Sequence, residues 1–363
     1  MSQTQATHSN SISGQDSNNG EKDKKAKSRK PASMLGTLFY DDAVDQGLRV
    51  QEIVIDYSDC ARDAPSGDDG KSFASLDPKK VKSSFTHGNS TVQPPMWKRS
   101  TTNVTYAPGV TLDTTLCSIT FTLPEDLKPP ILLYYRLTNF YQNHRRYVKS
   151  LDSDQLKGTA KSAGQIKGGS CDPLRLDENN KPYYPCGLIA NSLFNDTFHN
   201  PVLLNPKSSD GTNGNNKTYP MYRQGIAWPS DKALYGPTKY KLDEIAVPPN
   251  WQKRWPNGYT EDNPPPSLVD DEPFQVWMRT AGLPSFSKLA LRNDNQTMER
   301  GNYQVDIELN FPVTVYGGTK SLVITTTTVM GGKNPFLGIA YVVVGGICVV
   351  LGALFTITHL IKP

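Results

Sequence analysis

The feature that most restricts the fold of this chain is a long apolar segment near its C-terminus, from Phe336 to Ile361. It contains no Asp, Glu, Lys or Arg and is rich in Val, Ile, Leu and Ala. As an α-helix it would extend roughly 39 Å, which exceeds the ~30 Å hydrocarbon core of a bilayer. A soluble helix of this length would normally carry a polar face. The sequence therefore predicts a transmembrane helix that crosses with some tilt.

The residues around and within this segment support the interpretation. Pro335 suits the first turn of a helix, and Lys333 and Lys362 place positive charges at the level of the lipid headgroups. Glycine recurs every seven residues inside the segment, at Gly338, Gly345 and Gly352. Small residues on one helix face let a second membrane helix approach closely, although glycine is also common in membrane helices in general. We expect the three glycines to form a helix-packing face.

The first 50 residues have a different composition. Residues 1–33 are rich in Ser, Gln, Asn and Lys and end in a basic run. Such a sequence buries too little apolar surface to offset its ordering entropy, so we expect a disordered basic tail in the cytosol. Residues 34–50 begin with a short apolar stretch that Asp41 and Asp42 interrupt. This stretch is too short to span a bilayer, and we predict an amphipathic segment.

Residues 51–333 have the pattern of a β-rich domain. Partly alternating runs of β-branched residues recur between stretches that contain Pro and Gly. The clearest runs are 50–57, 117–123, 303–309 and 321–329. The stretch 130–147 has apolar residues at helical spacing but also fits a strand followed by a turn. We predict a mainly β membrane protein, with an antiparallel β-sandwich ectodomain that carries long insertions, followed by the transmembrane α-helix and a short tail in residues 334–363.

Cysteines and glycosylation motifs both concentrate in this body. Four of the five cysteines lie there, at Cys60, Cys117, Cys171 and Cys186. They are compatible with two disulfides in an oxidising compartment or with buried free thiols. Sequons of the form N-x-[ST] occur at Asn89, Asn103, Asn195, Asn216 and Asn295. A chain rich in Asn, Ser and Thr produces some sequons by chance, so their restriction to the body is the more informative observation.

The sequence offers no recognisable catalytic arrangement. The five histidines are not paired at metal-ligand spacing, and no C-x-x-C motif occurs. The glycine-rich stretches 317–321 and 331–334 do not satisfy the phosphate-loop pattern, and there is no G-x-S-x-G elbow. A net charge of +4 is too balanced to favour nucleic acid as a partner. We therefore expect a partner-binding ectodomain that is not an enzyme and holds no cofactor or metal.

Several strings of residues are long enough to indicate a particular protein family. They are 134–147 (YYRLTNFYQNHRRY), 185–197 (PCGLIANSLFNDT), 277–284 (WMRTAGLP), 316–320 (YGGTK) and, at the start of the apolar segment, 334–338 (NPFLG). With these strings the chain resembles the cell division control protein 50 family, also called ligand-effect modulators, from about residue 50 to the C-terminus. Members of this family are the accessory β-subunits of type IV P-type ATPases, the phospholipid flippases. The basic tail, rich in Asn and Gln, suggests a fungal member.

The resemblance implies several properties. Cys171 would pair with Cys186, and Cys60 with Cys117, while sequon glycans would lie on the luminal or extracellular face. The partner would be the catalytic subunit of the ATPase, which supplies phosphorylation, nucleotide binding and the lipid path. This chain would assist the folding and export of that subunit from the endoplasmic reticulum and steady its conformations by preferring some of them. The implied location is the lipid membrane of the endoplasmic reticulum, Golgi, endosomes or cell surface.

One feature departs from the family pattern. Members have a first transmembrane helix between the basic tail and the first strand, where this sequence has residues 34–50. An incomplete gene model or splice form of a two-helix subunit would explain the difference, and so would a misoriented or inactive variant. An alternative function is that of a cell-surface β-sandwich glycoprotein that binds a ligand or mediates adhesion.

Overall fold

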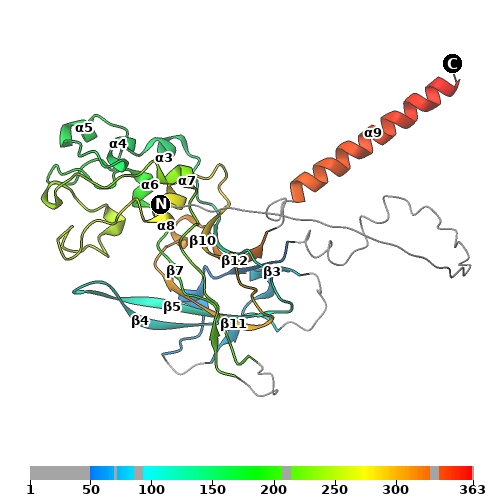
Figure 1. The fold of residues 1–363 in the computed structure, drawn as a ribbon, viewed down its shortest axis with the longest axis horizontal. Coiled ribbons are helices and arrows are strands. Elements are labelled where there is room, and N and C mark those ends of the chain that lie inside the picture. The colour runs from blue at the N-terminus through cyan, green and yellow to red at the C-terminus, as the bar shows by residue number, and fades with distance from the viewer. Residues whose placement is uncertain (1–49, 69–71, 86–92, 207–213, 328–334, 362–363) are drawn as a thin grey trace, which may run out of the picture. The chain divides into compact units, whose positions relative to one another are not determined.

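The computed structural model describes residues 50–68, 72–85, 93–206, 214–327 and 335–361 (Figure 1). The prediction for the basic tail in residues 1–33 lies outside this part of the chain, and so does the prediction for the amphipathic segment in residues 34–50 except for its last residue. The sequon at Asn89 also lies outside it.

The described body contains two antiparallel sheets. The five-stranded sheet has the order β10 (Phe286–Asn293), β6 (Ile131–Leu137), β12 (Lys320–Thr326), β1 (Glu52–Asp56) and β3 (Val81–Ser84). The seven-stranded sheet has the order β2 (Ala74–Ser75), β4 (Met96–Ala107), β5 (Val110–Leu123), β11 (Gly301–Leu309), β8 (Val202–Leu203) and β9 (Lys217–Thr218), and β7 (Thr197–Phe198) also pairs with β11. The predicted antiparallel, mainly β architecture is confirmed.

The core of the body contains apolar residues from both sheets. One apolar cluster joins the two sheets, because it contains inward residues of β1, β6 and β12 together with residues of β5 and β11. Strand β12 lies between β6 and β1, and all seven of its residues are buried. The ambiguous stretch 130–147 resolves into strand β6, a turn and a short helix. Strand β6 pairs with β12 on one edge and β10 on the other. Leu133, Tyr135 and Leu137 are buried, whereas Tyr134 and Arg136 between them are half-buried, as in a strand with one face toward the core.

A long insertion between β6 and β10 consists mostly of short helices and loops, apart from strands β7, β8 and β9 of the seven-stranded sheet (Figure 1). Its helices are α3 (Arg145–Lys149), α4 (Ser153–Leu156), α5 (Ala163–Lys167), α6 (Leu188–Asn191), α7 (Pro229–Lys232), α8 (Glu272–Met278) and the 3₁₀ turns η2 (Leu242–Glu244) and η3 (Pro249–Trp251). Outside the insertion lie α2 (Cys60–Asp63), η1 (Pro78–Lys80) and η4 (Thr314–Tyr316). The insertion has a second apolar cluster of its own, centred on Tyr184, Trp251 and Phe274.

Two disulfides connect the cysteines of the body, in the pairing that the resemblance implied. Cys60 of α2 is bonded to Cys117 of β5, with their Cα atoms 6.1 Å apart, and Cys171 is bonded to Cys186 inside the insertion, with a Cα separation of 5.7 Å. The first bridge ties the segment after β1 to the opposite sheet. The second closes a loop that contains no regular strand, where a covalent link compensates for the missing ladder of backbone hydrogen bonds.

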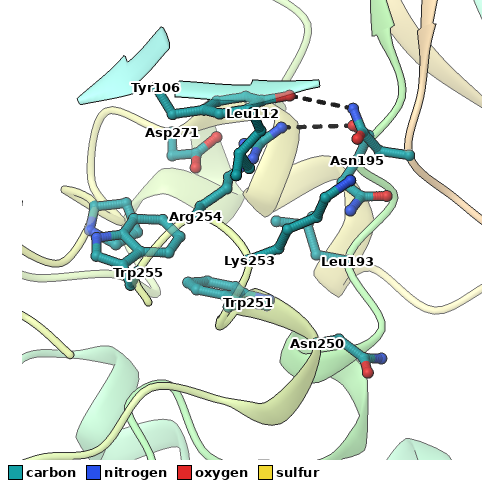
Figure 2. Close-up of a pocket in the computed structure, with 12 residues that line it drawn as sticks. Tyr106, Leu112, Leu193, Asn195, Asn250, Trp251, Lys253, Arg254, Trp255 and Asp271 are labelled. Carbon is teal, nitrogen blue, oxygen red and sulfur yellow. Dashed lines mark hydrogen bonds between the residues drawn. The ribbon is translucent and has the colours of Figure 1, made fainter. Parts of the chain in front are cut away.

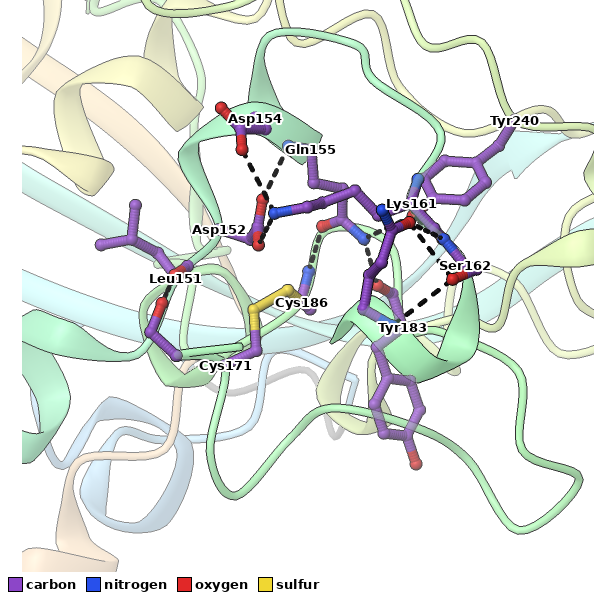
Figure 3. Close-up of polar contacts among 12 residues, drawn as sticks. Leu151, Asp152, Asp154, Gln155, Lys161, Ser162, Cys171, Tyr183, Cys186 and Tyr240 are labelled. Carbon is purple, nitrogen blue, oxygen red and sulfur yellow. Dashed lines mark hydrogen bonds and ion pairs between the residues drawn. A yellow bond between two sulfur atoms is a disulfide. The ribbon is translucent and has the colours of Figure 1, made fainter. Parts of the chain in front are cut away.

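Polar contacts surround the second disulfide (Figure 3). Gln155 is buried and accepts a hydrogen bond from the backbone N–H of Cys186 at 2.9 Å, while its Nε2 donates to the carbonyl of Tyr183 at 2.9 Å. Lys161 pairs with Asp152, with Nζ and Oδ2 separated by 2.7 Å. These side chains satisfy backbone and carboxylate groups that no sheet satisfies in this region.

Helix α9 (Pro335–Ile361) matches the predicted apolar segment. Residues 339–361 are long and apolar enough to cross a membrane, and none of the most apolar stretch is buried within the described protein. A Cβ atom built on Gly345 or Gly352 meets no other atom within 4 Å. The surroundings of Gly338 lie outside the described side chains. The helix-packing face stays a prediction, because it needs a partner to test it.

Candidate partner-binding site

The strings 134–147, 277–284 and 316–320, which suggested the family, meet at one end of the five-stranded sheet. Leu137, the last residue of β6, is paired with Lys320, the first residue of β12, and with Phe286, the first residue of β10. In antiparallel pairs the end of one strand lies beside the start of its neighbour. The loop after β6 therefore lies beside the loops that precede β10 and β12.

Backbone and side-chain hydrogen bonds join these three loops. The N–H of Thr138 donates to the carbonyl of Thr319 at 3.1 Å, and their two hydroxyls lie 2.7 Å apart. The amide of Asn139 donates to the carbonyl of Tyr316 at 2.6 Å. A Cβ on Gly318 would lie 2.6 Å from the Thr138 carbonyl oxygen, so glycine is required at this close approach.

The loop before β10 is attached in the same way. The N–H of Phe140 donates to the carbonyl of Pro284 at 3.1 Å, and the amide of Asn143 donates to the carbonyl of Gly282 at 3.1 Å. The Phe140 ring is surrounded by five other aromatic rings with centroids 5.5 to 6.3 Å away, namely those of Tyr147, Trp277, Phe286, Phe311 and Tyr316. Aromatic packing at these separations holds the loops in one arrangement.

A buried ion pair connects the fourth string, residues 185–197, to the same place. Lys320 Nζ lies 2.7 Å from Asp196 Oδ2, and the two side chains are only 5% and 0% exposed. Lys320 Nζ also donates to the carbonyl of Phe311 at 2.8 Å, and Asp196 accepts from the N–H groups of Asn310 and Phe311 at 2.6 and 2.7 Å. The hydroxyl of Tyr57 donates to the same carboxylate at 3.1 Å.

Burying a charge costs free energy, and each of these contacts offsets part of that cost for Asp196 or Lys320. Burial raises the pKa of Tyr57 well above its ordinary value, and the negative charge of Asp196 raises it further. The tyrosine therefore remains a neutral hydrogen-bond donor to the carboxylate. Sequence patterns did not reveal this pair, because its members are 124 residues apart.

A second buried cation supports the end of helix α8. Lys288 Nζ donates to the carbonyls of Val276, Trp277 and Arg279 at 2.8, 2.7 and 2.6 Å. It thus satisfies carbonyls at the helix C-terminus, where a positive charge also interacts favourably with the helix dipole. Burial lowers the pKa of Lys288 to about 7, and the nearby charge of Arg279 lowers it as well. The indole of Trp277 donates to the carbonyl of Ile189 at 2.8 Å and so joins α8 to α6.

Three joined loops carry large apolar side chains on their outer side. Tyr141, Leu283 and Val315 are 56%, 69% and 83% exposed. We call these three residues the loop surface. His144, Arg145 and Arg146 follow Tyr141 and are also exposed. An apolar group on a rigid support, with basic residues beside it, is typical of a surface that binds another protein.

A pocket lies between the β4–β5 hairpin and the insertion (Figure 2). We call it the aromatic pocket, and its main lining residues are Tyr106, Asn195, Trp251, Arg254, Trp255 and Asn310. The Arg254 guanidinium lies over the Tyr106 ring, 4.5 Å from its centroid, and donates to the carbonyl of Asn195 at 3.5 Å. Asp271 also lines the pocket, and burial raises the pKa of its carboxyl.

The sequon asparagines do not form one site. Asn103 lies on β4 and is exposed, as are Asn216 and Asn295, whereas Asn195 is half-buried in the aromatic pocket. Glycosylation of these residues stays a prediction. Within the described residues no group of three or more His, Cys, Asp or Glu side chains is placed to hold a metal ion.

Comparisons with known proteins identify the family that these strings suggested. The model of the LEM3 (ligand-effect modulator 3) family / CDC50 family matches residues 46–363. The chain belongs to this family. Among CDC50-family relatives, the phospholipid-transporting ATPase accessory subunit CDC50 of Chaetomium thermophilum is 44% identical over 316 residues, which are 86% of this chain and 76% of the relative.

The chain is also similar to CDC50-family proteins of yeast and mouse. The phospholipid-transporting ATPase accessory subunit CRF1 of Saccharomyces cerevisiae is 42% identical over 316 residues, 87% of this chain and 74% of the relative. Cell cycle control protein 50A of Mus musculus is 40% identical over 270 residues, 71% of each chain. The resemblance predicted from the strings is therefore confirmed, fungal relatives included.

Proposed function

We propose that this protein is a non-catalytic accessory subunit of a phospholipid-transporting P-type ATPase and forms a heterodimer with the catalytic subunit. The match to the CDC50 family across residues 46–363 carries the proposal, because it includes both the body and the apolar helix. Relatives that cover most of this chain are named as accessory subunits of such ATPases. Catalysis and the lipid path belong to the partner.

The proposed orientation places residues 51–333 in the lumen or outside the cell, anchored by the membrane helix in residues 334–363. Two disulfides support this orientation, since stable disulfides form in oxidising compartments. The proposed locations are membranes of the endoplasmic reticulum, Golgi, endosomes and cell surface. A mobility shift after endoglycosidase treatment tests the orientation, and a body that cytosolic protease digests in sealed vesicles contradicts it.

Two surfaces would bind the catalytic subunit. In the membrane, Gly338, Gly345 and Gly352 would let a partner helix approach the backbone of α9 closely. Outside the membrane, the loop surface would contact loops of the catalytic subunit. A rigid subunit that binds some conformations of the ATPase better than others shifts their populations, which is how binding assists folding, export and transport without chemistry.

The decisive experiment is co-purification of the full chain with a P-type ATPase in mild detergent. The double variant Tyr141→Ser/Leu283→Ser should lose most of the bound ATPase while the body stays folded. The matched control is Tyr222→Ser, because Tyr222 is 50% exposed and bridges to Arg292 near the opposite end of β10. Wild-type protein that brings down no ATPase, or cells that keep normal lipid asymmetry without this protein, would favour the ligand-binding alternative.

A further inference from the structure

Asn195 differs from the other sequon asparagines in the described residues. Asn103, Asn216 and Asn295 are exposed, as a surface glycan requires. Asn195 is half-buried and lines the aromatic pocket (Figure 2). Its backbone is held firmly, because the next residue, Asp196, belongs to the buried ion pair.

The amide group of Asn195 is suited to carry a sugar into this pocket. Its Oδ1 is buried and has no hydrogen-bond partner, and its Nδ2 forms no hydrogen bond within the described residues. A linkage through Nδ2 therefore breaks no contact. Nδ2 is not among the buried unpartnered atoms of the described residues, so it is the atom of this amide that the solvent reaches.

The walls of the pocket have the chemistry that a saccharide needs. The pocket contains about 650 Å³ of empty space, part of it open to solvent. Sites for small ligands combine aromatic surface with a few polar groups that fix orientation. Here the rings of Trp251 and Trp255 supply the aromatic surface, with their centroids 5.6 Å apart, and Arg254 supplies donors. The indole of Trp255 donates to the carbonyl of Pro264 at 3.1 Å, which fixes the orientation of its ring.

We propose that the first N-acetylglucosamine of an Asn195-linked glycan occupies the aromatic pocket and forms a structural part of the folded body. The linkage forms when Nδ2 displaces the lipid pyrophosphate from C1 of a lipid-linked oligosaccharide and releases one proton. The proposal rests on the proposed luminal orientation of residues 51–333. It predicts that the sugar at Asn195 is protected, while those at exposed sequons are not.

Native deglycosylation tests this protection. The full chain is produced with its ATPase in a fungal host and treated, without denaturation, with peptide-N-glycosidase, which must reach the bond between asparagine and the first sugar. Glycopeptide mass spectrometry should show release from Asn103 and Asn295 but none from Asn195 until the protein is denatured. Trp255→Ala should open the pocket and permit release from Asn195 in the native protein. Trp228→Ala is the control, because Trp228 is 62% exposed and is not part of the pocket.

A second measurement separates the sugar from the polypeptide. Thr197→Val removes the Asn195 sequon, while Thr197→Ser keeps it, so the pair differs mainly in the glycan. The Val variant should have a lower Tm than the Ser variant. Trimming with endoglycosidase H, which leaves one sugar, should not change the Tm of the Ser variant.

The outcomes distinguish this inference from the proposed function. Glycans at Asn103 or Asn295 with an unmodified Asn195 would overturn the inference and leave the luminal orientation intact. Native release from Asn195 at the same rate as from Asn103 would overturn it as well. A chain that carries no glycan at any sequon would contradict the orientation itself, and the inference with it.

Discussion

The sandwich and the insertion bury apolar surface in different ways. In the sandwich, strands such as β5 and β11 satisfy their backbone groups with a regular ladder of nine paired residues. In the insertion, helices of four to seven residues leave many groups unpaired, and buried side chains satisfy them instead. Trp251 donates to the carbonyl of Ala190 at 3.0 Å, and Tyr259 donates to that of Tyr184 at 2.6 Å. A single polar side chain should therefore matter more in the insertion than in a strand.

The ion pair between Asp196 and Lys320 is an exception to this rule, because Lys320 is part of sandwich strand β12 and its side chain should nevertheless matter strongly. Lys320→Met should lower the free energy of unfolding by about 3–5 kcal/mol, since it leaves a buried carboxylate without its charge partner. The control is Lys217→Met, whose partner Glu299 is 53% exposed while Lys217 is 63% exposed. That change should cost about 0–1 kcal/mol. Chemical denaturation followed by tryptophan fluorescence measures both, and equal losses would refute the special role of the buried pair.

One disulfide joins parts of the sandwich and the other lies inside the insertion, so removing each bridge tests one region. The two disulfides close loops with sequence separations of 57 and 15 residues. Removing the bridge Cys60–Cys117 with two alanines should cost about 4 kcal/mol, and removing Cys171–Cys186 about 3 kcal/mol, from chain entropy alone.

The loss of each bridge should also unfold a different part of the protein. Without Cys171–Cys186, protease cleavage should begin inside the insertion while the sandwich strands stay protected from hydrogen exchange. Without Cys60–Cys117, protection should fall across both sheets. Global unfolding by either substitution would show that the two regions form one cooperative unit.

Lys288 links the insertion to β10 and adds a dependence on pH. Because burial lowers its pKa from 10.5 to about 7, the unfolded chain holds the proton between these values and the folded chain does not. Stability therefore rises as the pH increases above 7, and this contribution is lost as the pH falls to the folded pKa. Relative to Lys288→Met, the wild type should gain about 2 kcal/mol between pH 7 and pH 9. Parallel pH profiles of the two proteins would contradict the assignment to Lys288.

An uncharged polar side chain should also matter more in the insertion, where Gln155 lies, than on a strand of the sandwich. Gln155→Leu removes contacts to the backbone of Tyr183 and Cys186 and should cost about 1–3 kcal/mol. Gln304 lies on strand β11, and its amide donates to the carboxylate of Asp306 at 2.9 Å. Gln304→Leu should change stability by about 0.5 kcal/mol or less, because the ladder already satisfies the backbone there. Thermal unfolding measures both variants, and similar shifts would remove the distinction between the regions.

The sequence by itself determined the local features of this protein. The apolar run from Phe336 to Ile361 predicted helix α9, and β-branched runs predicted strands β1, β5, β11 and β12, because both patterns repeat within a few residues. The disulfide pairing came only from the family resemblance, since four cysteines permit several connectivities.

The tertiary structure decided the rest. The stretch 130–147 became strand β6 because β10 and β12 pair with its two edges, and no local pattern contains that information. Asp196 meets Lys320, and Asn195 meets Arg254, only after distant segments have packed together. Periodicity reports which face of an element is apolar, whereas the site depends on which elements become neighbours, and that is a property of the whole fold.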